Sequence, residues 1–375
     1  MAGVRRVIRC AGITLMLGAL SSAVAMAGTT TERPSSILIF PKIIYDANHD
    51  TFIQVSNTNN SMVHAHCFYV NAAGICRLRP SEACRTDDDC SLNGPCDPQW
   101  QEVDFDIWLT KQQPTHWAAG FGRFTSPLDP ACDRNKGVYD CDGAVIDPGR
   151  IPPVGDPFYG ELKCIEVDAS GAPLSGNHLK GEVTIVTAAG DASKYNAIGL
   201  LGEPVTNDGN TVLCLGGEGR DECPSGAEYE GCAETLIVDH FAERADSPFL
   251  GPTSQVRTEV TLVPCAEDFE TQVPTKVVVQ FEITNEFEQP FSTSTTVDCW
   301  GNFLLDDINL IFDVSRLGAR VVQTHMRPAR GAKSGIVGVI EEYHTLGDLG
   351  AHAAFNLHER GERASTDLIV IPEGP

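Results

Sequence analysis

Cysteines occur in clusters along this chain. Of the 14 cysteines, four follow the pattern C-x7-C-x5-C-x5-C between residues 76 and 96, two bracket residues 133–140, and three repeat a C-x8-C interval between residues 214 and 232. The stretches between them are rich in Gly, Pro, Asp and Asn, which form turns rather than a packed core. We therefore predict disulfide-stapled loops, because only cross-links would order such stretches. The predicted disulfide cysteines are Cys76, Cys84, Cys90, Cys96, Cys132, Cys141, Cys214, Cys223 and Cys232.

The spacing of the cysteines favours disulfides over a zinc site. Structural zinc sites use C-x2-4-C pairs, and the sequence contains none. The segment "CRTDDDCSLNGPC", residues 84–96, resembles short Cys-x5-Cys-x5-Cys repeats of secreted bacterial proteins, a resemblance that implies no activity. Cys10 would leave with an export signal, so at least one of the 13 remaining cysteines would be free or pair with another chain. An unpaired thiol such as Cys67 is a candidate nucleophile, with a buried structural cysteine as the alternative.

The first 27 residues have the layout of an export signal. Three arginines precede an uncharged stretch from residue 10 to 25, and Ala25-Met26-Ala27 supplies a small-x-small cleavage pattern. Cleavage there would start the mature chain at Gly28. The alternatives are an uncleaved anchor, for which the apolar stretch is short, and the twin-arginine route. We expect an exported protein that is periplasmic, on the cell surface or secreted, with no membrane span after cleavage.

The chain is strongly acidic. Its formal net charge is −24, which would become −27 without the three arginines of the signal. A surface of this charge repels phosphate backbones and anionic headgroups, so we expect binding to neither nucleic acid nor membrane surfaces. Acidity in an exported protein suits solubility, divalent cations or basic partners. The expected partner is an extracellular or surface ligand of unknown identity.

Short segments that alternate apolar with polar residues recur along the chain and predict β-strands. They lie at residues 36–45, 51–57, 62–70, 102–110, 160–167, 181–187, 257–265, 276–285 and 318–326. The best helix candidate is residues 303–318, in which Leu304, Ile308 and Phe312 share one face. The predicted fold class is therefore all-β, with tandem antiparallel β-sandwiches of the immunoglobulin-like type and disulfide-stapled loop insertions.

A weak internal repeat indicates two such units. Ser56-Asn57 matches Thr284-Asn285, and the spacing from Gly160 to Glu166 recurs from Gly335 to Glu341. Chance similarity between β-rich segments is the alternative. The predicted division is a signal (1–27), an N-terminal β-sandwich (28–250) with cysteine-rich insertions near 73–156 and 202–233, and a C-terminal β-sandwich (251–375).

The opening of the predicted mature chain carries a second resemblance. "SSILIFPKIIYDANHDTFIQVSNTNNSMVHAHCFYV", residues 35–70, resembles the first hairpins of exported bacterial β-sandwich proteins, a largely uncharacterised group. The resemblance implies fold and export, and no functional residue is carried over with it.

Two kinds of side-chain cluster are metal-site candidates. His64 and His66 lie two residues apart on a predicted strand, so they point to the same side, where paired imidazoles bind zinc, copper or iron. The glutamate that the cupin pattern would add is missing, and Phe68 and Val70 on the same face favour partly buried, hydrogen-bonded histidines instead. Calcium is a possible cofactor of two acidic loops, although their spacing fails the EF-hand test and such residues also simply form turns. The oxygen ligands would be Asp87, Asp88, Asp89, Asp133, Asn135, Asp140 and Asp142.

Common catalytic signatures are missing from the sequence. It has no Gly-x-Ser-x-Gly, no His-Glu-x-x-His and no Gly-x4-Gly-Lys-Ser/Thr motif. We favour an exported, non-catalytic β-sandwich protein with a role in binding, adhesion or surface structure, whose cysteine-rich loops recognise the ligand. Two alternatives stay open: an extracellular hydrolase of polysaccharide or ester, whose working carboxylates one sequence does not single out, and a metal-dependent protein that uses His64 and His66.

Overall fold

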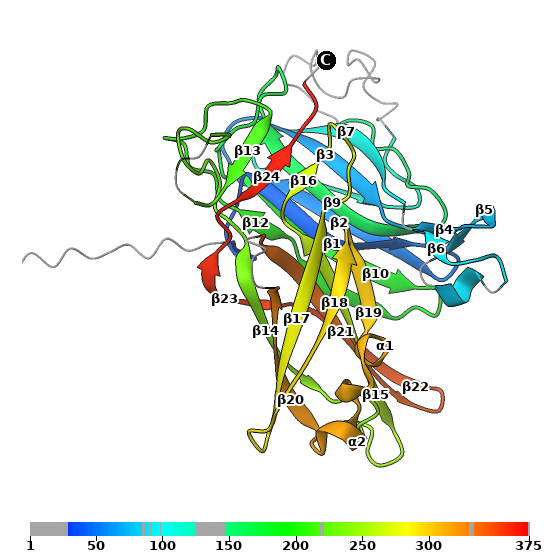
Figure 1. Cartoon of the computed structure of the whole chain (residues 1–375). Helices are drawn as coiled ribbons and strands as arrows, with labels where there is room; N and C mark the ends of the chain where they lie inside the picture. The colour runs from blue at the N-terminus through cyan, green and yellow to red at the C-terminus, as the bar shows by residue number, and fades with distance from the viewer. Residues whose placement is uncertain are drawn as a thin grey trace, which may run out of the picture.

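The computed structural model describes residues 29–84, 87–90, 92–97, 99–124, 148–217, 219, 221–329 and 334–373. Nearly all of its regular structure is antiparallel β-sheet (Figure 1). All nine predicted strand segments form strands. The prediction of an all-β protein is therefore confirmed, whereas the immunoglobulin-like topology stays a prediction.

Two sheets from the N-terminal half face each other across one apolar core. The first sheet has the order β12 (Ile198–Leu200), β1 (Ile37–Tyr45), β9 (Phe158–Val167), β3 (Val63–Asn71) and β7 (Gln101–Leu109). The second sheet has the order β11 (Ala192–Asn196), β10 (Leu179–Thr187), β2 (His49–Asn57) and β8 (Pro114–Ala118). Phe40 and Tyr69 of the first sheet and Ile53 and Trp117 of the second sheet meet in this core. Trp117 donates a hydrogen bond to the Tyr69 hydroxyl at 2.5 Å, which satisfies the buried indole N–H.

Two further sheets form the opposite half of the molecule. The third sheet has the order β18 (Pro290–Asp298), β17 (Lys276–Asn285), β20 (Val321–Pro328), β14 (Ala233–Phe241) and β23 (His358–Arg363). The fourth sheet has the order β19 (Gly301–Leu304), β15 (Gln255–Pro264), β21 (Ile336–Leu346) and β22 (Leu349–Asn356). Their core includes Leu236, Val260, Phe281, Phe312 and Ile340. Strand β14 pairs with β20 and β23, so residues 233–241 belong to the third sheet. The division of the chain into units at residue 250 stays a prediction.

A small junction sheet joins the two halves. Its strands are β13 (Val212–Leu215), β24 (Asp367–Val370) and β16 (Glu267–Asp268), so the last strand of the chain pairs with an N-terminal insertion and with the C-terminal half. Apolar residues of this sheet and the outer face of the first sheet share a core that includes Ile39, Phe68 and Phe269. This second contact explains why β1 and β9 are buried on both faces, and why β1 is almost entirely apolar.

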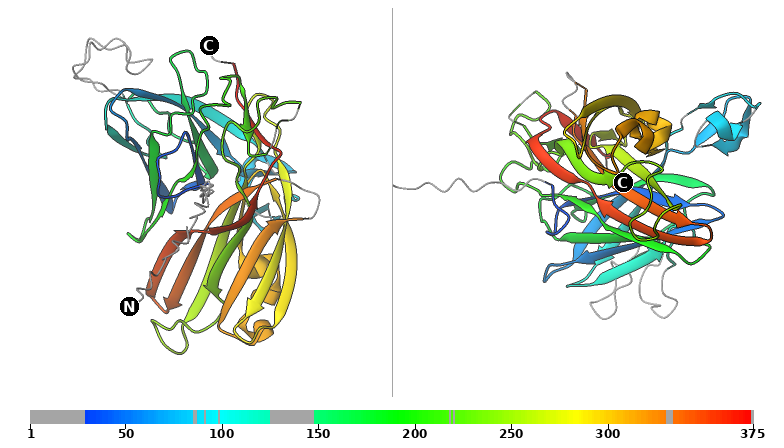
Figure 2. Two further views of the ribbon diagram at one scale, coloured as in Figure 1. Left: turned by 90° about the vertical axis from the view of Figure 1, so that its left-hand side faces the viewer. Right: turned by 90° about the horizontal axis from the view of Figure 1, so that it is seen from below.

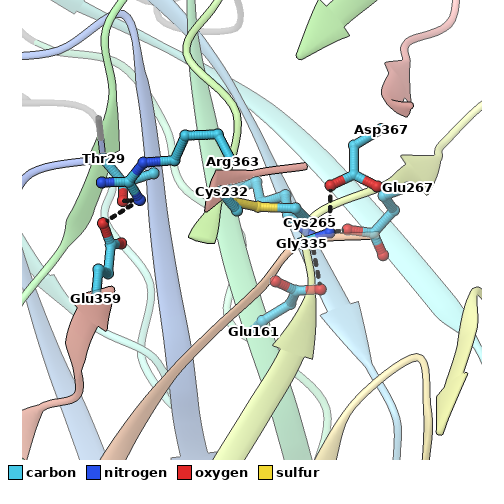
Figure 3. The surroundings of a disulfide bond; sticks show 10 residues. Thr29, Glu161, Cys232, Cys265, Glu267, Gly335, Glu359, Arg363 and Asp367 are labelled. Atoms are coloured by element: carbon cyan, nitrogen blue, oxygen red, sulfur yellow. Dashed lines mark hydrogen bonds and ion pairs between the residues drawn. A yellow bond between two sulfur atoms is a disulfide. The ribbon is translucent and has the colours of Figure 1, made fainter. Parts of the chain in front are cut away.

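Covalent and polar links reinforce the junction (Figure 3). The Cys232–Cys265 disulfide joins the residue before β14 to the residue after β15. Gly335 lies against this disulfide, because a Cβ atom there would come within 2.5 Å of Cys232 Cβ. The Gly335 N–H donates to Asp367 Oδ2 at 2.6 Å, which ties β21 to the C-terminal strand.

The predicted helix over residues 303–318 is broken into three short pieces. These are α1 (Leu305–Ile308), the 3-10 turn η2 (Leu310–Phe312) and α2 (Val314–Leu317). Asn309 and Asp313 have extended backbones, and the side chain of each accepts a hydrogen bond from the backbone N–H two residues later. Each residue is therefore the N-cap of a new helical turn. Gly318, with φ of 63°, ends the last turn as predicted.

Five disulfides link cysteines of the described residues, which fits an extracellular protein. Over the same residues, no helix has the length and apolar character needed to cross a membrane.

Candidate functional site

A cysteine module, residues 74–97, projects from the rest of the molecule (Figure 2). It contains the strands β4 (Gly74–Cys76), β5 (Arg79–Cys84) and β6 (Cys96–Asp97) and the 3-10 turn η1 (Asp87–Cys90). The disulfides Cys76–Cys90 and Cys84–Cys96 cross-link it. Among its described residues the buried apolar cluster consists of cysteines alone, so the module is held by its cross-links rather than by a hydrophobic core.

The tip of the module carries two exposed leucines. Leu78 is 72% exposed and Leu92 is 94% exposed. The Leu78 N–H donates to the Asn93 carbonyl at 2.7 Å, which brings the two turns that hold the leucines side by side. Gly94, with φ of +88°, allows this approach, because a Cβ atom there would lie 3.2 Å from Leu78 Cγ. Large apolar side chains held in water by a rigid loop are typical of a recognition surface.

An ion pair connects the turn between β4 and β5 to β6. Arg77 Nε donates to both carboxylate oxygens of Asp97, at 3.1 and 2.9 Å. These hydrogen bonds lower the pKa of Asp97, which keeps the carboxylate charged.

A cleft of about 190 Å³ separates the module from the C-terminal half. Its walls include Gly74 and Cys96 of the module, Tyr159 of β9, Thr296 of β18, and Trp300 and Phe303 at β19. Trp300 is held in place because its indole N–H donates to the Pro41 carbonyl at 2.7 Å. Aromatic walls with a few polar groups are typical of ligand clefts. We name the module and this cleft the candidate site.

A buried lysine links the two halves elsewhere. Lys42 of β1 lies 2.5 Å from Glu259 Oε2 of β15 and contacts Glu341 Oε2 of β21. The side chains of Lys42 and Glu341 are each 2% exposed. The Ser193 hydroxyl of β11 donates to Glu341 Oε1 at 3.0 Å, and the Tyr343 hydroxyl donates to Glu341 Oε2 at 3.1 Å. These five residues are the Lys42 network.

The Lys42 network borders a cavity of about 240 Å³. Burial works to lower the pKa of Lys42, but the two carboxylates outweigh it and raise the pKa above its ordinary value. Burial also works to raise the pKa of Glu341, but Lys42 and His352 together outweigh it and hold this pKa well below its usual range. Glu341 is therefore ionised at neutral pH and has no proton to give, so this pair of carboxylates suits a structural ion pair better than general-acid catalysis.

A second buried lysine lies at the junction sheet, against Glu161 and Glu267, two glutamates that are labelled in Figure 3. Lys163 of β9 donates to Glu161 Oε1 at 2.9 Å and contacts Glu267 of β16. Burial, with the charge of Glu267 added, raises the pKa of Glu161 well above its ordinary value. Lys163 thus faces two buried carboxylates, and burial together with Glu267 opposes the ionisation of Glu161.

Sequence reasoning missed both lysines and the cleft. A single lysine inside an apolar strand, as in "ILIFPKIIY" and "FYGELKCIEV", was the available signal. Such a lysine needs a carboxylate partner when the strand is buried on both faces.

The structure places His64 and His66 beside aspartates of β7. His64 Nε2 is 2.7 Å from Asp106 Oδ1, and its Nδ1 is 2.8 Å from the Asp168 carbonyl. His66 Nε2 is 3.0 Å from Asp104 Oδ2, and this hydrogen bond lowers the pKa of Asp104. The metal-dependent hypothesis for these histidines stays a prediction.

One group of three side chains in the described part of the chain is close enough to hold a metal ion. It is Cys76, Cys84 and Cys90, whose sulfurs are already in disulfides. Of the predicted calcium ligands, Asp87, Asp88 and Asp89 lie in η1, where Asp89 is exposed. The second acidic loop, with Asp133, Asn135, Asp140 and Asp142, lies outside the described residues, as do Cys132 and Cys141.

The remaining predicted disulfide cysteines all form disulfides. Cys214 pairs with Cys223, and Cys232 pairs with Cys265. The sequence did not single out Cys164 or Cys265, and it offered Cys67 as a candidate free nucleophile. Cys67 instead pairs with Cys164 on the neighbouring strand. The register of β3 and β9 places Cys67 and Cys164 directly opposite each other, which is why they pair.

Cys299 is the free cysteine of the described residues, and it is 3% exposed. Burial raises the pKa of its thiol, with the charges of Glu267 and Glu161 adding to the effect. We expect iodoacetamide to leave Cys299 unlabelled in the native protein and to label it after denaturation without reductant. Peptide mapping by mass spectrometry measures this, with the Cys214–Cys223 peptide as the unlabelled control. Labelling of Cys299 in the native protein would contradict its burial.

No function can be inferred from comparison with known proteins. The chain matches no family model and no curated protein sequence.

Proposed function

We propose that this chain is an exported, non-catalytic binding protein whose ligand is recognised at the cysteine module and its cleft. The observation that carries the proposal is the exposed pair Leu78 and Leu92 on a loop that two disulfides make rigid. A rigid loop loses little conformational entropy on binding, and apolar side chains that are already exposed need no rearrangement to bury surface in a partner. A role in adhesion or surface structure would use the same contact.

The arrangement also separates recognition from stability. The module has its own cross-links, and none of its described residues belongs to the three large apolar cores. Ligand specificity can therefore vary in the module without disturbing the sheets, as in other folds whose loops bind on a rigid scaffold.

Deletion of the module tests the proposal. Ile75 and Asp97 are register partners, so a short Gly-Ser linker can replace residues 75–96. Ligands are first selected with a glycan array and a random-peptide display library on the exported full-length protein. We expect the selected ligands to lose binding to the deletion variant, while its circular dichroism and thermal midpoint stay close to those of the full-length protein.

A double variant distinguishes the contribution of the two leucines to binding from that of the whole module. Leu78→Ser with Leu92→Ser keeps all four module cysteines and is expected to weaken binding by about 10- to 100-fold. Val205→Ser is the matched control, because Val205 is 95% exposed and lies outside the module. Ligands that bind the deletion and double variants as well as the full-length protein would refute the proposal.

A further inference from the structure

Free sheet edges are a hazard, because their unpaired N–H and C=O groups accept strands of other chains. Most edge strands of the four large sheets are protected. Strand β7 carries Glu102, Asp104 and Asp106, and β23 has the charged sequence "HERGER". Strands β8, β11, β12 and β19 have five residues or fewer. Strand β22 lies against the N-terminal half, where the Asn356 amide donates to the Asn196 carbonyl at 2.7 Å.

Strand β18 lacks these protections. It has nine residues, "PFSTSTTVD", lies at the edge of the third sheet, and has no charge between Phe291 and Val297. Among the described residues β17 is the one strand paired with it, and β19, α1 and η2 pack near it. In the described part of the chain, Ser292, Ser294 and Thr296 have no hydrogen bond beyond this pairing, and all three are exposed.

The register shows which backbone groups point away from β17. The Asn285 N–H donates to the Gln289 carbonyl at one end of the pair, and the Cys299 N–H donates to the Thr275 carbonyl at the other end. Hydrogen-bonded and non-hydrogen-bonded pairs alternate in an antiparallel ladder, so the odd-numbered residues of β18 bond to β17. The N–H and C=O groups of Ser292, Ser294 and Thr296 therefore face the open edge. Three donors and three acceptors in a row are what an added strand requires.

The open edge runs into the candidate site. Thr296 and Asp298, at the end of β18, line the cleft together with Trp300. A strand laid along β18 would thus bring one of its side chains to the mouth of the cleft.

The charges at the two ends of β18 indicate the kind of strand. Glu286 and Glu288 are exposed in the turn that precedes it, and Asp298, which ends it, forms an ion pair with Lys276 of β17. Two copies of this acidic chain repel each other, which opposes pairing of β18 with itself. With a net charge of −24, the chain favours a cationic partner instead.

We propose that β18 accepts an extended, cationic segment of another protein as an added strand of the third sheet. This inference rests on the proposed binding function and names its partner class: a polypeptide with an uncharged, β-branched centre and lysine or arginine at its ends. The backbone of β18 would supply affinity, and the cleft would select a side chain.

The probe is the synthetic peptide acetyl-KTVTVTVTK-amide, with calorimetry and the full-length protein. We expect saturable binding that weakens with salt. The control peptide carries N-methyl groups on alternate residues of one edge, which removes the N–H donors needed for strand addition, and it is expected to bind at least tenfold more weakly. Equal binding of the two peptides, or no binding of either, would overturn the proposal.

Two matched variants test the edge itself. Ser294→Pro removes an outward N–H and blocks the edge, in a position where edge strands tolerate proline. Ser294→Ala keeps the backbone and is expected to bind the peptide like the full-length protein, whereas Ser294→Pro is expected to lose at least tenfold in affinity. If Ser294→Pro does not fold, as judged by circular dichroism, the two peptides decide the question alone.

The remaining outcomes separate this inference from the proposed function. The deletion variant without the module should still bind the peptide through β18. If the module proves not to bind ligands, peptide binding by β18 can therefore still be tested. If β18 proves not to bind the peptide, ligand binding by the module can still be tested. Sedimentation that shows a dimer for Ser294→Ala but a monomer for Ser294→Pro would identify a second copy as the occupant and would overturn the cationic partner.

Discussion

Replacing Lys42 with methionine is expected to lower the free energy of unfolding by about 3–5 kcal/mol. The change leaves Glu259 and Glu341 facing each other in the buried Lys42 network without the lysine ammonium, with His352 Nε2, 3.2 Å from Glu341 Oε1, as the remaining basic group. Urea denaturation at pH 7 measures the loss. Lys194→Met is the matched control, because Lys194 pairs with Glu182 on the surface, where an ion pair contributes about 0–1 kcal/mol.

The effect of Lys42→Met should depend on pH. Because the pKa of Glu341 is lowered in the folded protein, its contribution to stability is complete above the pKa of an unfolded glutamate, about 4.3. This contribution is lost as the pH falls below that value toward the folded pKa. The stability difference between the parent protein and Lys42→Met should therefore shrink between pH 7 and pH 3. A triple variant that adds Glu259→Gln and Glu341→Gln should recover much of the loss, and a constant difference across this pH range would contradict the ion-pair explanation.

Removal of the Cys67–Cys164 disulfide is the other change with a large expected effect. The double variant Cys67→Ala with Cys164→Ala should lose about 2–5 kcal/mol of unfolding free energy. This bond joins adjacent strands of the first sheet across 97 residues of sequence, so it removes much of the entropy of the unfolded chain. The smaller disulfides of the module lie inside that loop and shorten it in the unfolded state, which places the expectation below the maximum for so long a loop.

The module supplies the control for this second prediction. Cys76→Ala with Cys90→Ala opens a loop of 14 residues that packs on no large core. Its effect should be confined to the module and detected by limited proteolysis, with little change in the global denaturation midpoint. Equal global midpoints for the two double variants would contradict the assignment of Cys67–Cys164 as the bond that holds the first sheet.

Local patterns predicted the strands because strand formation here follows side-chain alternation. In β17 the residues Val277, Val279, Phe281 and Ile283 are buried and their neighbours are exposed, as the sequence "KVVVQFEITN" indicates. The helix prediction failed for a local reason too. The apolar spacing over residues 303–318 is helical, but Asn309 and Asp313 bond their own downstream N–H groups and interrupt the helix.

Local patterns did not predict which residues distant in the sequence would pair. Cys67 and Cys164 meet only because β3 and β9 are neighbours, and the Lys42 network forms only because β1 meets β15 and β21 across the two halves. The residues next to Cys67, Cys164 and Lys42 in the sequence do not indicate the partners of these three residues. The cysteine module was predictable because its cross-links are local, at 14 and 12 residues of separation.

The position of β24 between β13 and β16 has a consequence for the order in which the protein assembles. Ribosomes make residues 367–370 after every strand of the four large sheets, yet the junction sheet has no central strand without them. The two pairs of large sheets can each form earlier, because their strands come from residues that precede this segment. The junction sheet can therefore form only after residues 367–370 are made, so a chain truncated or stalled before them would leave Phe269 and the other apolar residues of the junction core uncovered.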